Sequence, residues 1–132
     1  MDNFSVSNGE ELTRSELPLH LQQEALQIFE DGRFDDFHRK SDELLSEYAP
    51  SILVLNLKAE AYCQTGNLQE AVSILRQSLD VRPDAWGTMN RLGFVYHQLQ
   101  DYEKAMQFYD FALTLKPDFT EALVNKGNLA MQ

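Results

Sequence analysis

The chain has 132 residues, 43% hydrophobic and 24% charged, a balance that predicts one globular domain and excludes an intrinsically disordered chain. Its 21 acidic and 11 basic residues give a net charge of −10, which argues against a nucleic acid or an anionic membrane surface as partner. One cysteine, Cys63, excludes an intrachain disulfide, and no apolar run approaches the roughly 20 residues that cross a bilayer.

The first segment, residues 1–16, has no apolar periodicity. It begins MDNFSVSNGEEL, which is acidic and polar and lacks the layout of a secretion signal, so we expect a flexible segment and a cytoplasmic protein. Residues 1–50 contain 12 acidic and 4 basic residues, against 9 and 7 in residues 51–132. Either solvated helix faces with a loose tail or a steering surface for a basic partner explains this bias.

From residue 17 onward the apolar spacing is helical. Leu55, Ala59 and Tyr62 follow an i, i+4, i+7 pattern, and a break follows at residues 64–67. Within that break, Gly66 suits a left-handed helix end, and Asn67 is a good N-cap for the next helix. The expected helices span residues 17–30, 34–47, 51–65, 68–81, 85–99, 102–115 and 119–131.

The sequence repeats with a period of 34 residues. Tyr62 falls on Tyr96, Ala71 on Ala105 and Pro83 on Pro117, and the blocks 52–85 and 86–119 share seven identities. One helical hairpin buries too little apolar area to be stable alone, so neighbouring hairpins must stack to form a continuous core. The period therefore predicts an all-α array of helical hairpins.

These residues resemble the tetratricopeptide repeat. The resemblance rests on Leu92-Gly93-x-x-Tyr96, followed by Tyr102-x-x-Ala105, Tyr109, Ala112 and Pro117. It implies antiparallel helix hairpins stacked as a short right-handed superhelix of about 3.5 repeats and seven helices. Within an array over residues 17–132, it implies a degenerate repeat at 18–51, repeats at 52–85 and 86–119, and a partial repeat or capping helix at 120–132.

Candidate catalytic groups form no complete set. Cys63 and His97 are 34 residues apart and so occupy equivalent points on neighbouring helices, but a Cys–His couple also needs a third, orienting group. His20 and His38 are isolated, and no phosphate-binding glycine loop or metalloprotease motif is present. We therefore expect no enzyme activity, no metal and no cofactor.

Polar residues that recur with the period indicate a binding groove. Asn56 and Asn90 repeat at one position and Gln64 and Gln98 at another, and both positions are expected on the concave side. Side-chain amides donate and accept hydrogen bonds, so a row of them can hold an extended peptide; alternatively, they are neutral surface residues. The predicted peptide-binding residues are Asn56, Glu60, Gln64, Asn90, Arg91, Phe94, His97, Gln98, Asn125 and Asn128.

The chain is thus predicted to be a protein-interaction scaffold that binds a peptide or helix of a partner in its concave groove. Two alternatives remain: the N-terminal substrate-recognition or regulatory region of a larger enzyme such as a transferase, and a small acidic assembly or secretion chaperone. One subset of the resembled family clamps the carboxylate of chaperone tails, and of its clamp positions only Arg91 fits here. The apolar side of the helix at 119–131 further predicts self-association.

Overall fold

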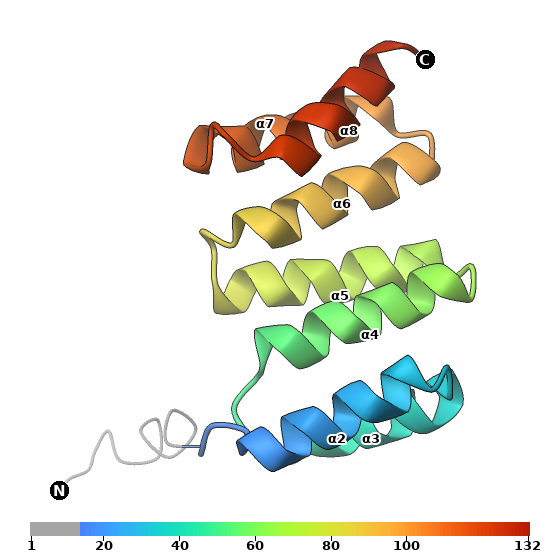
Figure 1. Cartoon of the computed structure of the whole chain (residues 1–132), viewed down its shortest axis with the longest axis vertical. Coiled ribbons are helices and arrows are strands. Elements are labelled where there is room, and N and C mark those ends of the chain that lie inside the picture. Colours follow the sequence, from blue (N-terminus) through green and yellow to red (C-terminus); the bar gives the residue numbers. More distant parts are fainter. Residues whose placement is uncertain (1–13) are drawn as a thin grey trace, which may run out of the picture. The chain divides into compact units, whose positions relative to one another are not determined.

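The computed structural model describes residues 14–132, and over this range the chain is all-α, with seven helices and no strand. Each helix begins and ends within two residues of the predicted bounds. The helices are α2 (Leu19–Glu30), α3 (Phe34–Glu47), α4 (Ile52–Gln64), α5 (Leu68–Val81), α6 (Trp86–Gln98), α7 (Tyr102–Leu115) and α8 (Thr120–Ala130). Consecutive helices form hairpins, as the repeat period predicts (Figure 1).

The chain divides into two compact units, Met1–Val54 and Leu55–Gln132, with the boundary in the first turn of α4. The predicted flexible segment, residues 1–16, lies largely outside the described residues and stays a prediction there. Its described end is attached to the first unit: the Arg14 guanidinium donates to the carbonyl oxygen of Leu45 at 2.6 Å. The proposed division into repeats also stays a prediction.

The first unit is a hairpin of α2 and α3. Phe37 occupies the position where the repeat has a small alanine. Its ring is fully buried and packs edge-on against the ring of Phe29, with 5.6 Å between centroids. On the surface, Lys40 Nζ lies 2.6 Å from Glu24 Oε1. This pairing lowers the pKa of Glu24 and raises that of Lys40, so both stay charged at neutral pH and join the two helices.

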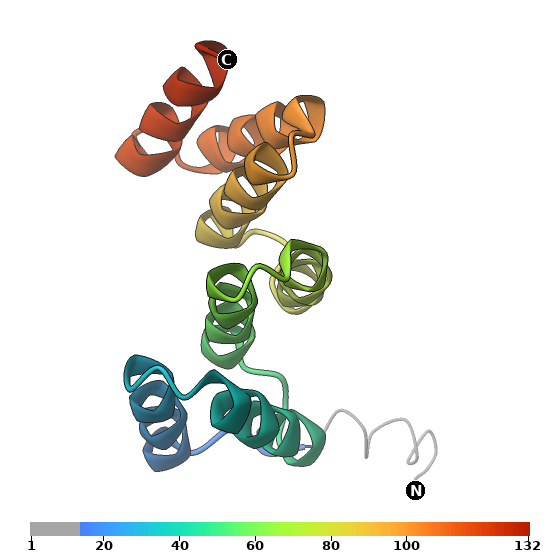
Figure 2. The same cartoon turned by 90° about the vertical axis from the view of Figure 1, so that its right-hand side faces the viewer.

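The second unit, from Leu55 onward, has a continuous core centred on α6. Leu92 and Val95 of α6 pack with Leu75 of α5 and Tyr109 of α7, and all four are buried. Successive helices reverse direction (Figure 1), and Figure 2, viewed close to the helix axes, shows α4 and α8 on one side and α5 and α7 on the other. The first helices of the hairpins in this unit, α4, α6 and α8, can therefore contribute side chains to one common face.

The turns between paired helices also follow the 34-residue period. Gly32 and Gly66 have φ values of +75° and +82°, and the equivalent residue of the next hairpin, Gln100, has a φ of +65°. A left-handed residue at this point ends a helix and lets the chain reverse. Glycine adopts this conformation without steric cost, whereas Gln100 places a Cβ there.

We expect Gln100→Gly to raise the free energy of unfolding by roughly 0.5–1 kcal/mol, because it removes the steric cost of a side chain at positive φ. Urea unfolding followed by circular dichroism measures the change. The control is Gln98→Gly, at a right-handed helical position of α6, which should destabilise the chain by a similar amount. A loss of stability in both variants would contradict the proposed cost at Gln100.

The last helix, α8, contributes Leu129 to the core of the second unit. Leu123, Val124 and Met131 are exposed, so self-association through residues 119–131 stays a prediction. Over the described residues, every helix is too short or too polar to pass through a lipid bilayer.

Candidate functional site

A groove of about 440 Å³ lies on the face formed by α4, α6 and α8. It is lined by Ala59, Glu60, Cys63, Gln64, Leu75, Asn90, Arg91, Phe94, Val95, Gln98, Glu121 and Asn125. The contributing side chains recur at helical spacing: Asn90, Phe94 and Gln98 stand four residues apart on α6 and so share one face of the helix. Seven of the ten predicted peptide-binding residues belong to this lining.

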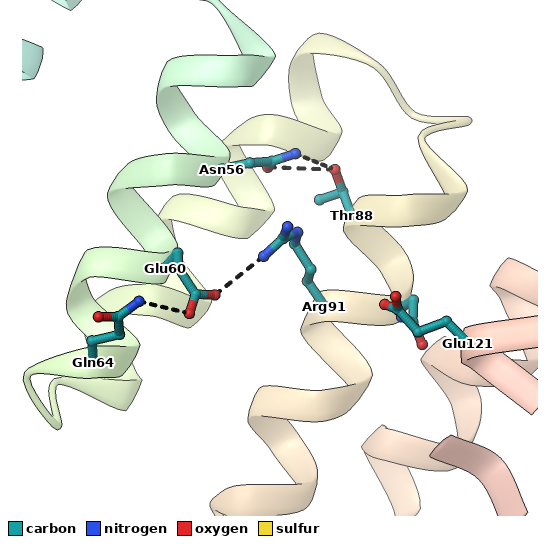
Figure 3. A network of polar contacts seen from close by, with 7 residues as sticks. Asn56, Glu60, Gln64, Thr88, Arg91 and Glu121 are labelled. Carbon is teal, nitrogen blue, oxygen red and sulfur yellow. Dashed lines mark hydrogen bonds and ion pairs between the residues drawn. The ribbon is translucent and has the colours of Figure 1, made fainter. Parts of the chain in front are cut away.

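An ion pair crosses the groove from α4 to α6. Arg91 Nη1 donates to Glu60 Oε1 at 3.2 Å, and Gln64 Nε2 donates to Glu60 Oε2 at 3.3 Å (Figure 3). Both carboxylate oxygens of Glu60 are therefore occupied, and the charge of Arg91 is neutralised within the chain. The pair is partly exposed, so it contributes little to stability and remains within reach of a ligand.

A second polar cluster joins α6 to α8. The side chain of Asn90 is 2% exposed, and its Nδ2 donates to Glu121 Oε1 at 2.7 Å. Its Oδ1 accepts from Asn125 Nδ2 at 3.1 Å. Both ends of the Asn90 amide are thus hydrogen-bonded inside the protein, and this cluster holds α8 against α6.

Asn56 has a comparable role one repeat earlier, outside the groove lining. Its Nδ2 donates to Thr88 Oγ1 at 3.2 Å (Figure 3), and the Thr88 hydroxyl also lies 3.5 Å from Ser78 Oγ. Thr88 and Ser78 are buried, so these bonds satisfy polar groups that α4, α5 and α6 bury together. The equivalent positions of the next hairpin hold Ala122 and Ala112, which explains why Asn90 has different partners.

The other two predicted residues also lie outside the lining. His97 packs edge-on against the ring of Tyr102, with 5.6 Å between centroids, and Asn128 is exposed on α8. Glu121 lines the groove but was not among the predicted residues. Its counterpart in the preceding repeat is Gly87, so comparing repeats gives no polar signal at that position.

The groove combines one aromatic side chain with polar neighbours. Phe94 is 45% exposed on the groove side of α6, where its ring lies among the polar lining residues. Burial raises the pKa of the nearby Cys63 thiol, and the carboxylate of Glu60 raises it further while Arg91 opposes the shift. The thiol is therefore protonated at neutral pH, which disfavours a nucleophilic role. No three potential metal ligands cluster anywhere in residues 14–132.

Comparisons with known proteins agree with this architecture. Residues 54–85 and 88–119 each match a sequence model of the tetratricopeptide repeat. No curated protein matches the sequence.

Solved structures show the same fold at low sequence identity. The first TPR of Spaghetti (RPAP3) bound to the HSP90 peptide SRMEEVD has a TM-score of 0.78 at 19% identity, covering 86% of this chain and 90% of that chain. The second TPR domain of human RPAP3, in complex with the HSP70 peptide SGPTIEEVD, has a TM-score of 0.77 at 16% identity, covering 85% and 93%. The Sgt2 TPR domain from Aspergillus fumigatus has a TM-score of 0.79 at 16% identity, covering 90% and 82%.

Proposed function

Because the chain belongs to the tetratricopeptide repeat family, we propose that it is a non-enzymatic protein-interaction module that binds an extended segment of a partner protein in the groove. Two structures of the same fold contain bound peptides, which supports this class of ligand. The groove volume of about 440 Å³ lies within the range of ordinary ligand pockets.

The observation that carries the proposal is the exposed ring of Phe94 within a polar hollow. An apolar side chain of a ligand that covers this ring removes apolar surface from water on both molecules, which is the main source of favourable binding free energy. The lining also contains three buried apolar residues, Ala59, Leu75 and Val95. Phe94 is therefore the expected anchor of the complex.

Exposed amides beside Phe94 supply the polar contacts. Gln98 is exposed one turn after Phe94, and the Gln64 side chain, whose Nε2 bonds Glu60, retains a carbonyl oxygen that accepts from a peptide N–H. These contacts position a peptide backbone without selecting its sequence. The affinity should be modest, because a short groove buries little area and ordering a flexible peptide costs entropy.

We expect Phe94→Ala to weaken peptide binding by about tenfold or more, as truncation of a central aromatic anchor typically does. The probe is the tightest-binding member of a random library of fluorescently labelled ten-residue peptides, and fluorescence anisotropy gives the dissociation constant.

The matched control is Phe111→Ala on α7, because Phe111 is 53% exposed but outside the groove lining. This variant should bind the probe as the unmodified chain does. Equal losses in the two variants, or a library without any binding member, would overturn the proposed function.

A further inference from the structure

The charges that line the groove are unevenly available to a ligand. Arg91 is the one cation of the lining, against two carboxylates, Glu60 and Glu121. Arg91 is already paired with Glu60 through Nη1 at 3.2 Å, so the Glu60 carboxylate offsets the charge that an acidic ligand would meet there. The groove therefore offers little to an acidic segment.

Glu121 is in the opposite situation. It is exposed, and its Oε1 accepts a hydrogen bond from the neutral amide of Asn90. The nearby cations are engaged elsewhere, since Lys126 pairs with Asp110 at 2.8 Å and Arg91 pairs with Glu60. Within the described part of the chain, no lysine or arginine pairs with Glu121, so its negative charge is open to a ligand.

The carboxylate of Glu121 also lies close to the apolar anchor. It bonds Asn90, and Phe94 follows Asn90 by four residues on the same face of α6, a rise of about 6 Å along the helix. In an extended peptide, residues i and i+2 point to the same side and are separated by about 6.6 Å. A ligand that carries a basic residue close to an apolar one can therefore contact Phe94 and Glu121 together.

We propose that the groove selects an extended segment in which a basic residue lies close to an apolar one. This inference rests on the proposed function and adds the chemical class of the partner. The unit that carries the groove also has a small acidic excess, 9 acidic against 7 basic residues over 51–132, which favours basic segments over acidic ones. The peptides bound to the RPAP3 domains end in the acidic sequence EEVD, so the selectivity expected here is the opposite of theirs.

The test compares three peptides that share one uncharged sequence and differ at a single position. Each contains an apolar residue, one spacer residue and then arginine, glutamine or glutamate at the variable position. Fluorescence anisotropy at low salt should rank them arginine first, glutamine second and glutamate last, with about fivefold between the first two. Binding without this order would overturn the charge selectivity and leave the proposed function standing. No binding by any peptide would overturn both.

Variants at Glu121 assign the selectivity to one side chain. Glu121→Gln keeps an oxygen that accepts from Asn90 but removes the charge, so the variant should lose the about fivefold preference and bind the arginine and glutamine peptides about equally. Glu121→Lys should favour the glutamate peptide. The control, Glu103→Gln on α7, changes the net charge equally at an exposed position outside the groove. An equal effect of both glutamine variants would overturn the assignment.

Discussion

Gly93→Ala should lower the free energy of unfolding by roughly 2 kcal/mol, a large part of the stability of a small domain. A Cβ at this position would lie 2.5 Å from Cε1 and 2.6 Å from Cδ1 of Tyr109. Real Cβ atoms do not approach ring carbons this closely, so α6 and α7 would have to separate. The resulting loss of core packing should exceed the gain of about 1 kcal/mol from replacing a helical glycine by alanine.

The ring of Tyr109 cannot turn away to relieve this contact. It is fully buried, so the surrounding core side chains hold it in place. Its hydroxyl has no hydrogen-bond partner among the described residues. The same burial raises the pKa of Tyr109 to about 12, because the ionised phenol would be poorly solvated.

Gly127→Ala is the matched control, because Gly127 stands 34 residues later at the equivalent position of α8. Apart from the backbone of α8 itself, no heavy atom would lie within 4 Å of its Cβ. The substitution should therefore raise stability by roughly 0.5–1 kcal/mol through helix propensity alone. Urea unfolding of both variants provides the comparison. If the two changed stability in the same direction, the close approach of α6 and α7 would not be the reason for a glycine at residue 93.

Asn90→Ala is expected to cost about 2 kcal/mol of unfolding free energy. The substitution removes both hydrogen bonds that join α6 to α8 and leaves a small cavity at a buried position. Thermal and urea unfolding, followed by circular dichroism, measure this loss.

Asn128→Ala is the comparison for Asn90, since Asn128 is an exposed amide on α8. It should change stability by less than about 0.5 kcal/mol. Measuring both the stability and the peptide affinity of Asn90→Ala also separates two roles for Asn90. Reduced peptide affinity in Asn90→Ala with stability unchanged would show that this amide reads the ligand and would contradict its assignment as a connection between helices.

Periodicity predicts the fold well because every repeat must meet the same packing demands. The small residues Gly93 and Ala105 mark where paired helices approach, and Gly32 and Gly66 mark turns that the structure confirms as left-handed. Gln100 shows the limit of this reasoning. It adopts the same left-handed conformation as Gly32 and Gly66, but a glutamine in the sequence does not predict a positive φ. Backbone geometry at that point is imposed by the two flanking helices rather than by the residue itself.

The site was less predictable, because a repeat comparison identifies a face but not the partners on it. Asn56 and Asn90 recur with the period, and both bond across to neighbouring helices. Their partners do not recur: Thr88 serves the first and Glu121 the second. Such pairs depend on the distance between helices that are more than 30 residues apart in the chain, which spacing along one helix does not reveal.

An NMR titration of the ¹⁵N-labelled chain with the arginine-containing peptide tests the central claim most directly. Binding in the groove predicts the largest amide shift changes at Glu60, Arg91, Phe94, Gln98 and Glu121. Residues on the outer surface of α5 and α7, such as Arg76 and Phe111, should change little. If the largest amide shift changes fell on α5 and α7 and the amides of the groove residues did not change, binding in the groove would be contradicted.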